Sequence, residues 1–478
     1  MNDIITAAND IIWSNALICL CLGAGLFFSI RTRFMQVRGV REMIRLIFAG
    51  KRSDAGVSSF QALAMSLSGR VGTGNIAGVA TAITFGGPGA IFWMWTVAFL
   101  GASTAFIEAT LAQIYKEKDD KGLYRGGPAY YIEKAMGQKW YAVIFAIATV
   151  IATGMLLPGV QANSIAASVE TAWGVPTWVS GICIAAALGF IIFGGVRRIA
   201  LFAEIVVPFM AVGYVLIALI IMVINIDELP HVVSLIFRSA FGADASFGAL
   251  LGLAVQWGVK RGIYSNEAGQ GTGPHPAAAA EVQHPAQQGY VQAFSVYVDT
   301  LLVCSATAFM IISTGMYNVQ RADGSFIINN LPGVEAGPGY TQAAVQTFIA
   351  GFGPSFVALA LIFFAFTTLV AYYYMAETNV QYINRQIHRG WMIFLLKLTI
   401  LAVVAYGTVR SASIAWALGD LGVGLMAWLN IIAILILQKP ALLALKDYDE
   451  QRKAGATIAF DPDKLGLKNA DLWRQSKD

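Results

Sequence analysis

The chain has 478 residues, 57% of them hydrophobic and 13% charged, and a formal net charge of +4. Soluble domains carry about 25% charged residues, so this composition is typical of an integral membrane protein and excludes an ordinary soluble domain. The small positive net charge comes from basic residues in the loops between membrane spans, and it does not indicate a nucleic-acid partner.

Eleven apolar runs are long enough to cross a bilayer, which takes about 20 helical residues. They lie at 11–30, 58–84, 89–113, 140–163, 176–195, 200–224, 247–270, 290–315, 352–376, 391–408 and 411–437. The first run follows no basic segment and precedes no cleavage-type site, so we interpret it as a retained helix. The sequence therefore predicts an all-α polytopic membrane protein with about 11 transmembrane helices.

Basic residues gather in alternate loops, which hold 25 of the 32 lysines and arginines. These loops are 31–57, 115–139, 197–198, 385–389 and 438–478. Because positive loops face the cytoplasm, the pattern predicts an outside N-terminus and a cytoplasmic C-terminus in a cell membrane, as in a bacterial inner membrane. Eleven spans require the two ends to lie on opposite sides, so the two observations agree.

Two glycine-rich stretches interrupt the spans that begin near residues 58 and 247, which are five spans apart. An odd number of spans makes the second set of five enter the bilayer from the opposite face, which is typical of an inverted-repeat transporter. We expect an N-terminal helix and basic cytoplasmic loop over 1–57, one five-helix repeat over 58–224, a second over 247–437 and a cytoplasmic tail over 438–478. No clear residue-level identity relates the halves, so the repeat rests on topology and on the placement of the breaks.

The first stretch, SGRVGTGNIAGV, runs from Ser68 to Val79 and predicts a broken helix near 68–76. Unpaired backbone groups in hydrocarbon cost several kcal/mol each, so such a break persists where another group uses them. The N–H groups that head the new half-helix would face an anion, and the carbonyls before the break would face a cation. This pairing suits an amino acid carried with a metal ion. Close packing of helices through Gly74 and Gly78 is the alternative.

The second stretch, GVKRGIYSNEAGQGTG at 258–273, predicts a break near 258–262. Lys260 and Arg261 would form a cytoplasmic gate with Glu267 or Glu377, or would extend to the inner surface. Trp257, beside this break, would line the binding pocket or pack in the core.

Other polar residues within spans each allow two interpretations. Asn75 would ligate an ion or cap the new half-helix. Thr367 and Thr368 are adjacent hydroxyls that suit sodium, or that bond to the preceding helical turn. Asp299 would carry a coupling proton or pair with a nearby cation such as Arg70, which could itself act as a gate.

Blocks of sequence in a fixed order resemble the alanine or glycine:cation symporters, also called the sodium:alanine symporter family. The most specific block is GGPGAIFWMWTVAFLG at 86–101. The others are RVGTGNIAGVA at 70–80, RGGPAYY at 125–131, GVQAN at 159–163, SNEAG at 265–269 and VDTLLVCSA at 298–306. The resemblance covers nearly the whole chain.

This resemblance implies the five-plus-five inverted-repeat fold of the bacterial leucine transporter with one extra N-terminal helix, and sodium-driven uptake of alanine or glycine. It implies no cofactor beyond the co-transported sodium ion. The implied substrate residues are Thr73, Gly74, Asn75, Gln161, Trp257 and Gly258. The implied sodium ligands are the Ser68 and Val71 carbonyls with the Thr367 and Thr368 hydroxyls. Arg70 departs from the leucine transporter, which has a small residue there; Arg70, Lys260 and Asp299 are candidates for a gate or for coupling.

We therefore expect a secondary active symporter that works by alternating access in the lipid bilayer. It is not expected to be an enzyme, because no nucleophile–base pair, metal-ligand cluster or P-loop is found. Two alternatives stay open: a proton-coupled amino acid transporter, with Asp299 or Glu108 as the carrier, and a passive pore. A histidine proton relay is not expected, because all four histidines are predicted in loops: His231, His275, His284 and His388.

Overall fold

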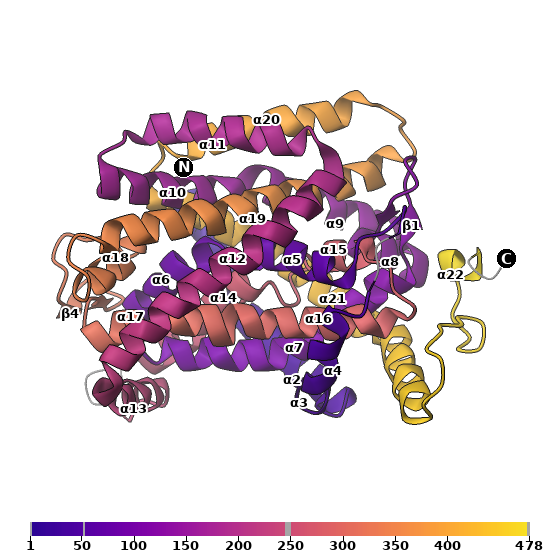
Figure 1. Cartoon of the computed structure of the whole chain (residues 1–478), viewed down its shortest axis with the longest axis horizontal. Coiled ribbons are helices and arrows are strands. Elements are labelled where there is room, and N and C mark those ends of the chain that lie inside the picture. Colours follow the sequence, from indigo (N-terminus) through magenta and orange to yellow (C-terminus); the bar gives the residue numbers. More distant parts are fainter. Residues whose placement is uncertain (1, 51–52, 244–249, 476–478) are drawn as a thin grey trace.

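The computed structural model describes residues 2–50, 53–243 and 250–475, which Figure 1 shows as a bundle of long helices. By length and composition, seven helices in this described part of the chain can cross a membrane. They are Ile4–Arg31, Ala90–Ile114, Lys139–Trp173, Gly195–Ile224, Pro285–Thr314, Gly353–Asn384 and Ala412–Lys453. Two shorter apolar helices and two interrupted segments lie at the other four predicted spans. The prediction of an all-helical polytopic membrane protein is confirmed.

The first half of the chain, over its described residues, forms helices and one pair of short strands. Its elements are α1 (Asn2–Ile12), α2 (Asn15–Arg31), α3 (Met35–Arg38), α4 (Val40–Ile47), α5 (Ser59–Arg70), η1 (Gly74–Gly78), α6 (Val79–Gly86), α7 (Ala90–Ile114), β1 (Glu117–Lys118), β2 (Tyr124–Arg125), α8 (Pro128–Met136), α9 (Lys139–Ile151), η2 (Ala152–Leu156), α10 (Leu157–Trp173), α11 (Thr177–Ile192), α12 (Gly195–Ile224), η3 (Ile226–Glu228) and α13 (Leu229–Ala240). The predicted basic loop at 31–57 thus contains two short helices, α3 and α4.

The second half follows the same pattern. Its elements are α14 (Leu251–Asn266), α15 (Pro274–Ala279), α16 (Pro285–Val296), η5 (Tyr297–Cys304), α17 (Ser305–Thr314), β3 (Asn318–Gln320), β4 (Phe326–Asn329), α18 (Pro338–Gln346), α19 (Gly353–Asn384), α20 (Trp391–Gly407), α21 (Ala412–Lys453) and α22 (Asp471–Gln475). Because α21 continues to Lys453, the tail predicted from residue 438 is helical over 438–453.

Equivalent spans of the two predicted repeats pack against one another. α6 contacts α14, α7 contacts α16, α10 contacts α19 and α11 contacts α20. These helices belong to the first, second, third and fourth spans of each predicted set of five, and Figure 1 shows α11 and α20 along one edge of the bundle. Such pairing is expected of two sets of helices related by a twofold axis. The residue bounds of the two repeats stay a prediction.

α12 illustrates how a span separates its core side from its outer side. Phe209, Val212 and Leu216 are exposed on the outside of the bundle, whereas Val207 and Tyr214 are buried. Buried and exposed positions recur at helical spacing, but both kinds are apolar. A helix whose outer side is as hydrophobic as its core side is suited to lipid and not to water.

The two ends of the bundle carry different elements. One end, termed the β4 face, carries β3, β4, α13 and α18, and the other, termed the α22 face, carries β1, β2, α8 and α22 (Figure 1). Both strand pairs are short antiparallel hairpins, with Glu117 opposite Arg125 and Val319 opposite Ile328. The hairpins lie between spans and were not expected from an all-helical prediction.

Candidate functional site

The span predicted at 58–84 is interrupted where the sequence indicates. α5 ends at Arg70, Val71 is extended (φ −77°, ψ 90°), and η1 begins at Gly74. Val71 and Gly72 lie outside regular helix, and both are buried. The predicted break near 68–76 is therefore confirmed.

Side chains take up the amides that this interruption frees. The Gly72 N–H donates to Oδ1 of Asn75 at 2.8 Å, and the Thr73 N–H donates to Oε1 of Gln161, on α10, at 3.0 Å. Asn75 lies within η1 and accepts from a backbone N–H just before this helix, as the third residue of a capping box does. This is close to the capping role, which is one of its two predicted roles. Four of the predicted substrate residues, Thr73, Gly74, Asn75 and Gln161, lie together around the break.

Asp299 lies within the π-helix η5 and faces the capping residue of the break. Its Oδ1 accepts hydrogen bonds from the Asn75 amide at 2.6 Å and from the Ser265 hydroxyl at 3.1 Å, and its Oδ2 accepts from the Thr300 hydroxyl at 2.7 Å. All three donors are neutral, so Asp299 is held by hydrogen bonds and not by the ion pair that one interpretation of the sequence expected.

Arg70, the last residue of α5, is fully buried but does not bond to Asp299. Its guanidinium donates to the Gln292 carbonyl at 3.2 Å and to the Ser295 hydroxyl, both on α16. A Cβ on Gly273 would lie 2.6 Å from Nη2 of Arg70. Arg70 thus reaches from the first interrupted span towards the loop that follows α14.

Of the four predicted sodium ligands, the structure brings two together across helices. The Thr368 hydroxyl, on α19, lies 3.5 Å from the Val71 carbonyl oxygen. Both threonine hydroxyls also donate to the Phe364 carbonyl, one turn back on their own helix, Thr367 at 2.8 Å and Thr368 at 3.0 Å. At Ser68 the predicted ligand is the backbone carbonyl, which stays a prediction; its hydroxyl donates within α5, to the Met65 carbonyl at 2.7 Å. Thr368 and Val71 are therefore the pair that faces the break.

The second interruption lies later in the chain than predicted. α14 is continuous through 258–262 and ends at Asn266, and the loop 267–273 separates it from α15. The glycines in the predicted break serve packing, because a Cβ on Gly258 would lie 2.5 Å from the Ala90 carbonyl and one on Gly262 would lie 2.3 Å from Val97. The break near 258–262 was wrong because glycine permits close helix approach as well as helix termination.

Lys260 and Arg261 do not reach Glu267 or Glu377. The Lys260 ammonium lies 2.8 Å from the Asp420 carboxylate, and the Arg261 guanidinium makes two hydrogen bonds to the same carboxylate, at 2.8 and 3.0 Å. Asp420 is on α21, so both cations are held against that helix. The predicted gate with Glu267 or Glu377 is therefore corrected to a buried ion cluster with Asp420.

Glu377 and His275 also differ from expectation. The Glu377 carboxylate lies 3.7 Å from the Arg125 guanidinium, on the α22 side of the bundle. His275 is buried in α15 and its Nε2 lies 2.7 Å from the Asn379 amide nitrogen, so it is not a loop residue. His231 also lies in a helix, α13. The prediction that all histidines fall in loops was therefore wrong.

The two interrupted spans touch at their breaks. A Cβ on Gly74 would lie 3.1 Å from the Ser265 Cα and 3.3 Å from the Tyr264 ring, so glycine allows α14 to lie directly against η1. Tyr264 in turn packs on Trp416, with ring centroids 4.9 Å apart. The hydroxyl of Tyr264, Nε2 of Gln161 and the hydroxyl of Thr73 have no hydrogen-bond partner among the described residues.

A cavity of about 700 Å³ lies on the β4 face, and Trp416 and Trp257 are among its lining residues together with the Lys260–Arg261–Asp420 cluster. Trp257 also stacks on Phe85, with ring centroids 4.7 Å apart. Since Tyr264 contacts both Trp416 and Gly74, it lies between this cavity and the first break. Trp257 therefore lines the approach from the β4 face.

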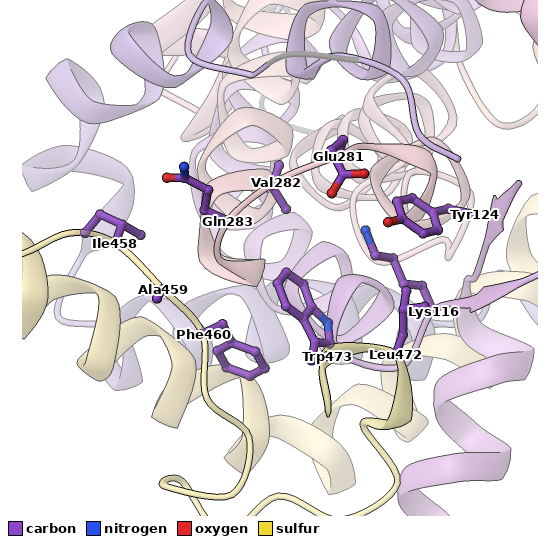
Figure 2. A pocket seen from close by; sticks show the side chains of 10 residues that line it. All are labelled: Lys116, Tyr124, Glu281, Val282, Gln283, Ile458, Ala459, Phe460, Leu472 and Trp473. Carbon is purple, nitrogen blue, oxygen red and sulfur yellow. The ribbon is translucent and has the colours of Figure 1, made fainter. Parts of the chain in front are cut away.

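Figure 2 shows a separate cavity of about 330 Å³ on the opposite, α22 face. The Lys116 ammonium donates to the Ala280 carbonyl at 2.8 Å and lies 3.9 Å from the centre of the Tyr124 ring. Burial lowers the pKa of Lys116 to about 7. The C-terminal segment forms one wall of this cavity, and its Trp473 indole donates to the Gln113 carbonyl at 2.9 Å. None of the predicted site residues lines it.

Sequence reasoning missed three polar residues at these sites: Ser265, Thr300 and Asp420. Asp420 carried a usable signal, since it is an acid inside the apolar run SIAWALGDLGVG, and acids within spans are functional candidates by default. Ser265 and Thr300 carried none, because a single hydroxyl in an apolar helix usually bonds to its own backbone.

Comparison with known proteins identifies relatives over almost the entire chain. The model of the sodium:alanine symporter family matches residues 1–462. The protein YrbD of Bacillus subtilis (strain 168), provisionally named a sodium/proton-dependent alanine carrier protein, is 64% identical over 475 residues, 99% of this chain and 98% of that one. The sodium/proton-dependent alanine carrier protein of Bacillus sp. (strain PS3) is 57% identical over 434 residues, 90% of this chain and 97% of that one.

A solved structure supports the architecture independently of these names. The crystal structure of a mutant manganese transporter of Eremococcus coleocola matches with a TM-score of 0.52 at 13% identity, covering 84% of this chain and 81% of that one. Identity this low shows the fold alone. The family match and the two relatives go further. With the interrupted helices, they establish that the chain belongs to the sodium:alanine symporter family, whose members are transporters and not enzymes.

Proposed function

We propose that this protein imports a small neutral amino acid, alanine and/or glycine, together with sodium, by alternating access. The observation that carries this proposal is the first break. There, a backbone carbonyl and a side-chain hydroxyl lie 3.5 Å apart beside two amides that head a new helix. A cation and a carboxylate can thus be bound side by side. Two relatives are named sodium/proton-dependent alanine carriers, which supports alanine as the solute.

The substrate carboxylate would bind at Thr73–Asn75. The Thr73 N–H is bonded to Gln161, so an incoming carboxylate would take over this donor while Nε2 of Gln161 and the Thr73 hydroxyl, which lack partners among the described residues, donate to it. The close approach of Gly74 to Ser265 favours a substrate with a small side chain. Trp257 and Gly258, predicted substrate residues, lie on α14, and we place Trp257 on the approach to the site.

Sodium would bind between the Val71 carbonyl and the Thr368 hydroxyl, which links α19 to the interrupted span. Hard cations take oxygen ligands of this kind. The Ser68 carbonyl and the Thr367 hydroxyl remain proposed ligands; Thr367, like Thr368, donates its proton to the Phe364 carbonyl and keeps oxygen lone pairs for a cation. Sodium binding would then hold the break in the geometry that the carboxylate requires.

We assign the α22 face to the cytoplasm, because the predicted basic loops 115–139 and 385–389 and the C-terminal segment lie there and positive loops face inwards. The cavity on the β4 face would be the route from outside. The protein would then lie in a bacterial inner membrane with its N-terminus outside. Rocking of the two repeats would expose the breaks to either face in turn.

Uptake of labelled alanine into proteoliposomes tests this function. We expect uptake to cease when external sodium is replaced by potassium or choline at constant pH, because the Val71–Thr368 site would lack its ion. Uptake that continues unchanged without sodium would contradict the assignment. A proton-coupled transporter, the second candidate that the relatives' names favour, would instead follow an imposed pH gradient in the absence of sodium.

A further inference from the structure

Glu267, at the start of the second break, is a buried acid whose two carboxyl oxygens have no partner within normal hydrogen-bond limits among the described residues, and the Thr272 hydroxyl lies nearby. The other two acids near the breaks are hydrogen-bonded. Glu108 accepts from the Gly269 N–H at 3.2 Å and from the Asn430 amide at 2.7 Å, and Asp299 accepts from three donors. An ionised carboxylate without donors in a low-dielectric interior is strongly disfavoured, so Glu267 requires a compensating positive charge.

The backbone around Glu267 places this carboxylate between the two interrupted spans. Glu267 has φ = 57°, in the left-handed region that glycine commonly occupies at the end of a helix. A non-glycine residue held in this conformation is often functional. On the facing helix, a Cβ on Gly69 would lie 3.2 Å from Oε2 of Glu267, so glycine at position 69 makes room for the carboxylate.

The charged and titratable groups that interact with Glu267 come from several elements. They are Arg70 on α5, Glu108 on α7, Asp299 in η5, Tyr264 on α14 and Tyr372 on α19. This set holds one cation and, with Glu267, three carboxyls. Arg70 forms no ion pair with Glu267 and hydrogen-bonds to α16 instead. A fully ionised cluster would be negative overall, which leaves room for an additional cation.

The loop after Glu267 supplies neutral oxygens for such a cation. The carboxamide of Gln270 and the hydroxyl of Thr272 are fully buried and have no partner within normal hydrogen-bond limits among the described residues. Thr272 is also the polar group of this loop that lies near the Glu267 carboxyl. Carboxylate, carboxamide and hydroxyl oxygens are the ligands that hard cations prefer.

We propose that Glu267 binds one monovalent cation, a proton or a sodium ion in competition, and that this is a second coupling site distinct from the Val71–Thr368 pair. The inference rests on the proposed function, since it supplies a coupling ion for the same transport cycle. Glu267 joins α14 to the loop that leads to α15. A cation bound to its carboxyl would therefore act on the second break, as sodium bound at Val71 would act on the first. The cation is taken up on one side and released with the substrate on the other.

Competition between proton and sodium is the measurable consequence. In proteoliposomes, the sodium concentration for half-maximal alanine uptake should rise at least fivefold for the wild-type protein between pH 8.5 and pH 5.5. The Glu267→Gln variant, which mimics the protonated acid, should show less than a twofold change, and its Hill coefficient for sodium should fall by about one. A variant that keeps the wild-type pH dependence and Hill coefficient would overturn the proposal.

Two variants serve as matched controls. Glu170→Gln removes a carboxylate at the exposed end of α10 and should behave as wild type at both pH values. Thr368→Ala alters the other proposed cation site, so it should weaken sodium affinity and keep the pH dependence. If Thr368→Ala also abolished the pH dependence, the two sites would not be distinct and the proposal would fail.

Two further measurements keep the test decisive. If Glu267→Gln does not reach the membrane, Glu267→Asp retains the charge on a shorter side chain and should weaken sodium affinity at least tenfold; unchanged affinity would overturn the site. If uptake by the wild type requires sodium but the required sodium concentration does not change with pH, the Glu267 site is refuted and the proposed function stands. Uptake without any sodium requirement would refute the proposed function.

Discussion

At the scale of single residues, the site depends on how closely α19 and α10 approach the first break. A Cβ on Gly72 would lie 2.4 Å from the Thr368 hydroxyl oxygen and 3.0 Å from Oε1 of Gln161. Gly72→Ala should therefore displace both proposed ligands and lower alanine uptake at least tenfold, while the protein still reaches the membrane. Initial uptake rates, normalised to the amount of protein in the membrane, measure this. Gly213→Ala is the control, because nothing lies within 4 Å of a Cβ on this glycine in α12. Equal rates for the two variants would contradict the role of the break.

The individual residues that the sequence revealed are those whose chemistry is unusual in a span. Asn75 and Gln161 stood out because amides in apolar helices need partners, and the structure places both at the break. Thr367 and Thr368 could not be separated, since both are hydroxyls and only the helix rotation decides which one faces Val71. The isolation of Glu267 could not be predicted at all, because a missing partner is a property of the three-dimensional arrangement.

At the scale of elements, α14 is fixed to α21 by a buried ion cluster on the β4 side of the site. Asp420 bonds to both Lys260 and Arg261, and these three side chains are largely buried. Removing one partner of a buried ion pair costs about 3–5 kcal/mol, because a charge is left uncompensated. Asp420→Asn should thus lower the thermal unfolding midpoint of the purified protein clearly. Glu170→Gln, at an exposed acid on α10 away from this cluster, should change stability by less than about 1 kcal/mol. A midpoint unaffected by Asp420→Asn would show that the cluster does not hold the two helices.

The start and end of an element could be predicted where a local cluster of residues has one structural explanation. They could not be predicted where the same residues, such as glycines, have two. The break in the first span was located because glycine, asparagine and threonine cluster there, although Gly74 also serves packing against Ser265. In the second span the glycines at 258 and 262 press α14 against α7, whereas Gly269 and Gly271 adopt positive φ in the true break. A sequence lists glycines of both kinds, and only the contacts of α14 distinguish them.

At the scale of the whole molecule, span number follows from hydrophobic length, so each of the eleven predicted runs has a helix at its position. The hairpins β1–β2 and β3–β4 and the packing of the C-terminal segment on the α22 face did not follow, because short polar segments carry little periodic signal. The predicted orientation also awaits a test. The proposed transport cycle also belongs to this scale, since it would require two repeats to move around one site.

An imposed membrane potential distinguishes this cycle from a passive pore. Alanine is a zwitterion with no net charge, so a pore would equalise its concentration whatever the potential. A symporter that carries one net positive charge inward gains about 2.3 kcal/mol per 100 mV. Since about 1.4 kcal/mol corresponds to a tenfold ratio, the steady-state accumulation of alanine should rise roughly 50-fold for each net charge when 100 mV, inside negative, is applied. Labelled alanine in proteoliposomes with a potassium diffusion potential measures the ratio. Gly72→Ala liposomes provide the background. Accumulation that does not respond to the potential would exclude net inward movement of positive charge with the amino acid.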